Sequence, residues 1–307
     1  MTKYRIVDAH CDTLYGIVLE GKAPEDCTVR PENLRRGGVS LQTFAMFAGA
    51  QGREGHPYEN AVAMLASSER IGVPMLKGAL PENLPDAPHG VFSIEGGEVL
   101  EGKLSRLHEF DASCRVRMIA LTWNNENEIG YPAVLGDGGH LKPFGLELLS
   151  EMDALGILAD VSHLNVAGFW DCAERTKLPI IASHSNLRTL CDVRRNLYPD
   201  QVRAIIEKKG FIGINFYSAF LAKDRDATLD DVLRHIDGIA ELGGIDVLGF
   251  GSDFDGIDAS PEGLSSPDDF PKLMALLEDH GYTEAQLRGI AGENLFRVLK
   301  AAKDHRT

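Results

Sequence analysis

Eight short apolar runs divide the chain, and most of them are separated by segments whose apolar residues recur with helical spacing. The runs lie near 5–10, 39–47, 90–95, 116–123, 156–163, 179–184, 210–217 and 246–253. Helical periodicity is clearest at 146–155 and at 229–242. This alternation predicts parallel strands that are buried on both faces and joined by crossover helices.

Eight repeats of strand and helix favour a closed (β/α)8 barrel, the TIM barrel, over an open doubly wound sheet. At 307 residues with 44% hydrophobic content, the chain can bury one large core. We therefore expect a single domain over 1–307. The stretch around 48–89 is the least regular and is expected to be an elaborated connection within that domain.

Two helix-start signals follow the last apolar run. Ser266 precedes Pro267, a residue suited to the first position of a helix. Thr283 is followed three residues later by Gln286, the spacing of a capping box. These signals predict two further helices over 266–303, after the eighth strand.

Charge and cysteine usage exclude several partners and compartments. The chain has 31 basic and 46 acidic residues, and its net charge of -15 disfavours nucleic acid and anionic membranes as partners. The five cysteines are odd in number and form no CxxC pair, which argues against a disulfide framework. No apolar stretch approaches the ~20 residues that cross a bilayer, and the first strand begins too early for a signal sequence. A soluble, cytoplasmic protein is predicted.

Familiar single-segment motifs are missing. The sequence contains neither a P-loop nor GxGxxG, and neither HExxH nor GxSxG. DFDGID fails as a calcium loop because Asp258 occupies the glycine position and Leu264 stands where the bidentate glutamate belongs. Hydrolytic chemistry in this chain would need residues gathered from several strands.

Side chains that commonly bind metals stand where the apolar runs end. They are His10 and Asp12 after the first run, Glu95 after the third, His163 after the fifth, His184 after the sixth and Asp253 after the eighth. The carboxyl ends of barrel strands share one face, where barrel enzymes hold their catalytic groups. Imidazoles and carboxylates together suit zinc, and also manganese or cobalt.

The spacing of these residues supports one shared site. His10 and Asp12 are two apart and project from the same face of a strand. His163 and His184 end consecutive strands, although a single strand-end histidine is more often structural. Asp253 is a candidate general acid and base. Asp255 points inward by the same parity, so the alternative is that one of these two aspartates only orients a neighbouring histidine.

Nine motifs in order resemble the renal or membrane dipeptidase family of binuclear zinc peptidases, peptidase family M19, from about residue 5 to 300. They are DAHCDT, IEGG, LTWNNEN, DVSH, SHS, RRN, NFY, GFGSDFDG and ENLFRVL. The resemblance implies a metallo-dependent hydrolase barrel with two Zn²⁺ ions per subunit. By this resemblance His10 and Asp12 hold one ion, His163 and His184 hold the other, and Glu95 bridges them.

The resemblance also implies a reaction. Two zinc ions lower the pKa of a shared water, so that hydroxide forms near neutral pH and attacks a peptide bond. Asp253 would carry the proton to the departing amine. Arg195, the second arginine of RRN, matches the residue that grips the substrate's C-terminal carboxylate. The expected substrates are dipeptides, including those with a C-terminal D-residue, and the expected assembly is a homodimer.

One position departs from the family pattern. The best-known members end the fourth strand in LTH, whereas this chain reads LTWNN and places Trp123 there. An indole donates one hydrogen bond and cannot become cationic. Trp123 can still donate one hydrogen bond to the substrate, Asn124 or Asn125 can take over the contact, or the step relies on zinc alone. Losing such a donor can cost on the order of 10²-fold in turnover.

Two alternatives remain open at this level. One is a related binuclear hydrolase of a cyclic amide, lactone or ester, because its metal site would use the same ligand types. The other is a metal-binding protein without catalysis, which only Trp123 suggests. The intact Asp253 and the complete ligand set favour an enzyme.

Overall fold

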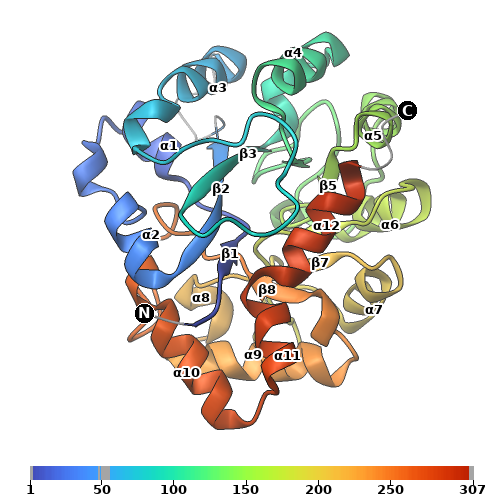
Figure 1. The fold of residues 1–307 in the computed structure, drawn as a ribbon. Helices are drawn as coiled ribbons and strands as arrows, with labels where there is room; N and C mark the ends of the chain where they lie inside the picture. The colour runs from blue at the N-terminus through green and yellow to red at the C-terminus, as the bar shows by residue number, and fades with distance from the viewer. Residues whose placement is uncertain (1–2, 48, 50–55, 304–307) are drawn as a thin grey trace.

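Eight parallel strands form a closed barrel in sequence order in the computed structural model, which describes residues 3–47, 49 and 56–303. Figure 1 shows the strands ringed by helices. The strands are β1 Ile6–Asp8, β2 Val39–Phe47, β3 His89–Glu95, β4 Met118–Ala120, β5 Leu158–Asp160, β6 Ile181–Ala182, β7 Phe211–Ile214 and β8 Leu248–Phe250. Asp8 of β1 pairs with Phe250 of β8 and closes the ring. Each predicted run coincides with one strand, so the predicted barrel is confirmed.

The helices follow the strands as the periodicity predicts. They are α1 Thr13–Val18, α2 Pro31–Gly37, α3 Pro57–Ala66, α4 Leu104–Cys114, α5 Pro143–Leu155, α6 Val166–Arg175, α7 Pro199–Glu207, α8 Ser218–Leu221, α9 Leu229–Glu241, α10 Phe270–His280, α11 Glu284–Arg288 and α12 Asn294–Lys303. Within the described ranges, none of them combines the length and hydrophobicity that crossing a lipid bilayer requires.

Local sequence explains where these helices begin and end. Thr228 and Asp231 form a capping box at the start of α9, whose Val232 and Ile236 are buried against the barrel. Pro143 opens α5 at a position where its missing N–H costs nothing. Gly156 ends α5 in the left-handed region, with φ 67°.

The C-terminal segment contains more helix than the two predicted. Ser266 caps a 3₁₀ turn, Pro267–Asp269, that leads into α10, and Thr283 caps α11. A π-helical turn, Gly289–Glu293, then joins α11 to α12. Apolar residues of α12 pack on residues inside the barrel, including Val7. In Figure 1, α12 crosses one end of the barrel.

The connection between β2 and β3 contains α3 and a 3₁₀ turn, Ser68–Ile71. The buried Arg117 donates a hydrogen bond to the carbonyl of Leu76 (3.3 Å) and ties this connection to the barrel. Residues 48 and 50–55 of the expected elaborated connection lie outside the described residues. The single-domain organisation stays a prediction.

Candidate metal centre

The carboxyl ends of five strands bring the predicted ligands together. The side chains of His10, Asp12, Glu95, His163 and His184 are all less than a tenth exposed, and that of Asp253 is 14% exposed. Asp12, Glu95, His163 and Asp253 line a cavity of about 500 Å³. Ligand atoms of His10, Glu95 and His184 lie within 4.8 Å of one another, as do those of His10, Asp12 and Asp253.

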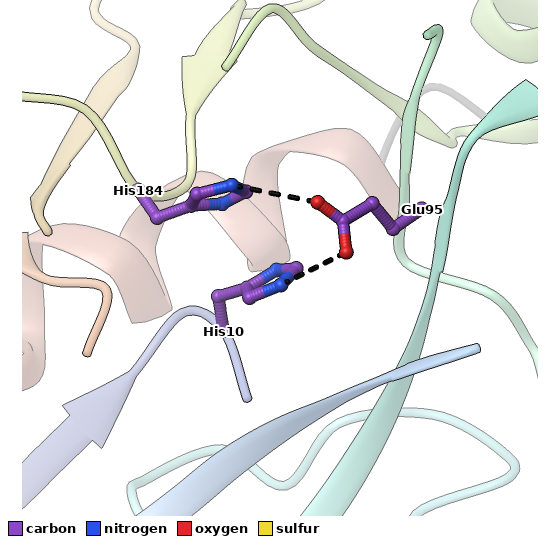
Figure 2. A group of neighbouring side chains, drawn as sticks. All are labelled: His10, Glu95 and His184. Atoms are coloured by element: carbon purple, nitrogen blue, oxygen red, sulfur yellow. Dashed lines mark ion pairs between the residues drawn. The ribbon is translucent and has the colours of Figure 1, made fainter. Parts of the chain in front are cut away.

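Glu95 lies between the histidines, with one carboxylate oxygen facing each side. Its Oε2 is 3.3 Å from Nε2 of His10. Its Oε1 is 2.8 Å from Nε2 of His163 and 3.5 Å from Nε2 of His184. Figure 2 shows His10 and His184 meeting the two oxygens separately. Gly96 follows in the left-handed region at φ 88° and turns the chain away from the carboxylate.

A buried hydrogen-bond chain fixes the tautomer of His184. Asp160 accepts hydrogen bonds from the hydroxyls of Ser162 (2.7 Å) and Ser183. Because the Ser183 hydroxyl proton points to Asp160, its oxygen accepts from Nδ1–H of His184 at 2.7 Å. The Nε2 atom of His184 therefore carries a lone pair, the form that binds a metal.

The neighbouring His163 is held in the same tautomer. Its Nδ1 is 3.2 Å from Oδ1 of Asn124, an acceptor, so Nδ1 carries the proton. The two Nε2 lone pairs of His163 and His184 then face each other across 3.0 Å and also face Glu95. Lone pairs so arranged repel unless a cation lies among them, so the residues fit a metal ion.

The other half of the centre is built from β1 and β8. Nε2 of His10 is 3.4 Å from Asp12 and 3.9 Å from Asp253. Asp8 lies beneath them and accepts hydrogen bonds from the backbone N–H (2.8 Å) and hydroxyl (2.5 Å) of Ser252. Nε2 of His10 and Oδ1 of Asp12 are buried and make no hydrogen bond to other described residues. A buried carboxylate oxygen without a partner is costly, so this half also fits a cation.

The β5 and β6 histidines favour the neutral state. Burial lowers the pKa of His163, and the nearby positive charge of Arg195 lowers it further. Burial lowers the pKa of His184 well below its usual range, and the charges of His10 and Arg195 act in the same direction. Neutral imidazole is the form that coordinates a metal.

The β1 side holds its protons more tightly. Burial opposes protonation of His10, but Glu95 and Asp12 outweigh it and raise its pKa well above the usual value. Burial and the charge of Glu95 raise the pKa of Asp12 to about 8. Burial also opposes ionisation of Glu95, but His10 and His163 hold its pKa well below the usual value. The cluster gathers carboxylates that an ion would neutralise.

Asp253 and Asp255 have separate roles in the structure. Oδ2 of Asp253 accepts a hydrogen bond from Nδ2 of Asn215 (2.9 Å), which leaves Oδ1 on the side of His10. Asp253 adopts the left-handed region at φ 63°, which glycine adopts most easily and which aspartate tolerates better than most other residues. Asp255 instead accepts hydrogen bonds from the Thr13 hydroxyl and the Thr28 backbone N–H, each at 2.6 Å. It anchors this loop and contacts no histidine among its hydrogen bonds to described residues.

Arg195 lines the same cavity and is 6% exposed. Its Nε and Nη1 atoms make no hydrogen bond within the described part of the chain. The guanidinium carbon is 5.5 Å from the centre of the Phe220 ring, and burial lowers the pKa of Arg195 to about 10. A buried guanidinium with free donors suits a carboxylate ligand.

The fourth strand leads to Trp123 and Asn124, which also line the cavity. Trp123 packs on Phe47, with ring centres 4.7 Å apart, and lies 6.4 Å from the His163 ring. The side-chain oxygen of Asn124 faces Nδ1 of His163 and orients that ring. This contact competes with the predicted contact between Asn124 and the substrate. Asn125, the third candidate here, donates a hydrogen bond to the carbonyl of Gly49 (3.4 Å).

The sequence reasoning missed several residues of the site. They are the buried acceptors Asp8 and Asp160, the hydroxyl of Ser183, the amide of Asn215, and the cavity side chains Tyr15, Phe47, Tyr217 and Phe220. A signal existed for the two acids, because each is the last residue of an apolar strand and close before a ligand histidine.

Comparisons with known proteins agree with this arrangement. The family described as membrane dipeptidase, peptidase family M19, matches residues 1–307. An uncharacterized dipeptidase of Schizosaccharomyces pombe is 35% identical over 217 residues, which cover 68% of this chain and 52% of the yeast protein. The crystal structure of an M19 metallopeptidase named dipeptidase AC has 26% identity and a TM-score of 0.88, covering 98% of this chain and 99% of that one.

A second similar structure contains a ligand. It is a metallopeptidase from Rhodobacter sphaeroides bound to a phosphinate mimic of the dipeptide L-Ala-D-Ala, with 25% identity and a TM-score of 0.88. The match covers 98% of this chain and 100% of that chain. From the family match over the whole chain, together with these two structures, the chain belongs to peptidase family M19 and is a metal-dependent dipeptidase.

Proposed function

We propose that this protein hydrolyses dipeptides with two Zn²⁺ ions, one held by His10 and Asp12, the other by His163 and His184. Glu95 is the ligand shared by both. The observation that carries this proposal is the position of Glu95, whose two oxygens face the two sets of histidines separately. Imidazoles and carboxylates are the ligand types that zinc prefers.

When bound, the two ions would activate a water molecule and polarise the scissile carbonyl. The chain's own residues would then handle the proton. Oδ1 of Asp253 accepts it and delivers it to the departing amine, which is otherwise a poor leaving group. Asn215 supports this task by holding Oδ2, so that the free oxygen keeps its direction.

Arg195 selects the substrate's free C-terminus in this proposal. Its Nε and Nη1 donors, which make no hydrogen bond to described residues, offer a forked site for a carboxylate, and Arg195 itself is only 6% exposed. The Rhodobacter structure holds a mimic of L-Ala-D-Ala. By similarity, substrates of this chain would include dipeptides with a C-terminal D-residue. A homodimer is also proposed, and sedimentation showing only monomer would contradict it.

The test combines metal content with amino-acid release from L,L and L,D dipeptides. Glu95→Gln should lose bound zinc and reduce kcat/KM by more than about 100-fold, because the effect of a direct ligand exceeds that of its supporting contacts. Glu98→Gln is the matched control, since Glu98 is a half-buried neighbour bonded to Asn127. It should retain both properties. No release from any dipeptide by protein with two ions bound would overturn the proposal.

A further inference from the structure

Three aromatic side chains form one wall of the cavity, and we call them the aromatic wall: Tyr15 of α1, Phe47 at the end of β2, and Trp123 after β4. The ring centres of Tyr15 and Phe47 are 5.1 Å apart, and those of Phe47 and Trp123 are 4.7 Å apart. Tyr15 and Trp123 are half-buried, so part of each ring borders the cavity. The wall is a continuous apolar surface beside the metal ligands.

The aromatic wall and Arg195 come from different sides of the ring of strands. In the closed ring of eight strands, β3 and β7 are opposite each other. The wall residues come from elements on both sides of β3. Arg195 follows β6 and Phe220 follows β7, so the guanidinium and its ring neighbour belong to the opposite side. Glu95 and His163 of the ligand cluster border the same cavity as both groups.

This placement orients a dipeptide. If its C-terminal carboxylate binds Arg195, its peptide bond lies over the ligand cluster and its first residue reaches the opposite side. We infer that the aromatic wall binds the side chain of the first residue, so that the preferred substrates begin with an aromatic or large aliphatic residue. This inference rests on the proposed dipeptide hydrolysis. Offset ring contacts and burial of apolar area would favour such residues.

The remaining lining disfavours acidic first residues. Glu20 borders the cavity but is paired with Lys22 (2.8 Å). Asp258, an exposed carboxylate, and the partly buried Asp255 border it as well. They attract the free ammonium group of a dipeptide and repel a second negative charge on the first residue. The cavity of about 500 Å³ is of the size that holds small organic ligands, so a bulky first residue has room.

The kinetic test varies only the first residue, with alanine second. We expect kcat/KM for phenylalanyl-alanine to exceed that for alanyl-alanine by about tenfold or more, because apolar pockets discriminate on that scale. Glutamyl-alanine should be the poorest. Trp123→Ala should bring the first ratio to within about threefold of unity. The control is Trp170→Ala, because the other tryptophan, Trp170, lies on α6 and does not line the cavity. This variant should keep the wild-type ratio of the two kcat/KM values.

The outcomes separate the two proposals. The proposed role of the aromatic wall would be wrong if the wild type gave equal kcat/KM values for all first residues. It would also be wrong if Trp123→Ala kept the wild-type ratio. Either result would leave the proposed dipeptide hydrolysis unaffected. Absence of hydrolysis with two ions bound would instead overturn the proposed function.

A binding measurement tests the wall without turnover. The chain has two tryptophans, so Trp170→Phe leaves Trp123 as the only one. In an Asp253→Asn background, saturating phenylalanyl-alanine should shift or quench the fluorescence of Trp123, and glycyl-alanine should change it much less. Calorimetry confirms saturation for both peptides. Equal responses at saturation would contradict contact between the wall and the first side chain.

Discussion

The two halves of the metal centre use opposite electrostatics. The β5–β6 half consists of two buried neutral histidines, His163 and His184, whose protons are held at Nδ1 by side-chain acceptors. The β8–β1 half consists of His10 with two carboxylates, Asp12 and Asp253, and its histidine has a raised pKa. One half presents prepared lone pairs, and the other holds protons on His10 and Asp12 that a bound ion would displace.

This difference indicates how one barrel end can bind metal and move protons. Histidines locked in one tautomer bind an ion without first losing a proton. A half rich in carboxylates also holds a group able to accept and return a proton. Among the described residues, the carboxylate of Glu95 contacts histidines of both halves, and the rings of His10 and His184 lie 4.0 Å apart. A change in one half should still leave some property of the other intact.

The largest effect should come from Asp253→Asn. Removing the proposed proton carrier should lower kcat by about 10²- to 10⁴-fold, while the metal content stays that of the wild type. Metal analysis and steady-state kinetics on one preparation check this. Asp255→Asn is the matched control and should change kcat by less than about tenfold, because Asp255 anchors a loop. Loss of metal from Asp253→Asn would make Asp253 a ligand of the β8–β1 half.

Arg195→Ala should raise KM for dipeptides by about 100-fold with a smaller change in kcat, because a buried partner of the substrate carboxylate is lost. Arg194→Ala is a close control, since the neighbouring side chain is half exposed and lies 4.0 Å from Asp137. Its KM should stay near wild type. An unchanged KM in Arg195→Ala would contradict the proposed contact between Arg195 and the substrate carboxylate.

Ser183→Ala should weaken metal binding by about 10- to 100-fold, because the Nδ1 proton of His184 loses its acceptor. Competition with a chelator measures the affinity of each ion. Ser252→Ala is the counterpart in the β8–β1 half, where the serine hydroxyl contacts Asp8 rather than a ligand ring. A smaller loss is expected there. Equal losses would show that histidine tautomers do not distinguish the halves.

Acidification should release the ions in order. In the metal-free protein the raised pKa of His10 leaves a proton that an ion must displace, whereas the lowered pKa of His184 leaves none. Affinity at the β8–β1 half should therefore fall as pH falls, by about tenfold per pH unit below the pKa of His10. The β5–β6 half should hold its ion until lower pH. Equilibrium dialysis at several pH values would reveal simultaneous loss if this ordering is wrong.

Much of the fold was predictable because barrel strands are buried on both faces. Each apolar run is then long enough to stand out, and a polar residue at its end marks the point where the strand leaves the core. His10, Glu95 and His184 were found in this way, and the structure brings them together. The N-cap of α11, Thr283, could also be predicted, because the signal of a capping box lies within four consecutive residues.

The features that the sequence did not predict depend on contacts between segments that are distant along the chain. The link from Asp160 to Ser183 spans two strands, and the one from Asn215 to Asp253 spans two others. Periodicity carries no information about such pairs. The separate roles of Asp253 and Asp255 were hidden for the same reason, since both point inward by parity and only their partners distinguish them. The π-helical turn Gly289–Glu293 also lacks a local signal.

The left-handed backbone at Asp253, φ 63°, has a consequence for engineering. Aspartate adopts this region more readily than most residues, but glycine adopts it without any steric cost. A screen for thermostability alone would therefore tend to select glycine at this position and discard the carboxylate assigned to the proton. At this residue a substitution that raises thermal stability is expected to lower activity. Variants should therefore be ranked by activity before they are ranked by melting temperature.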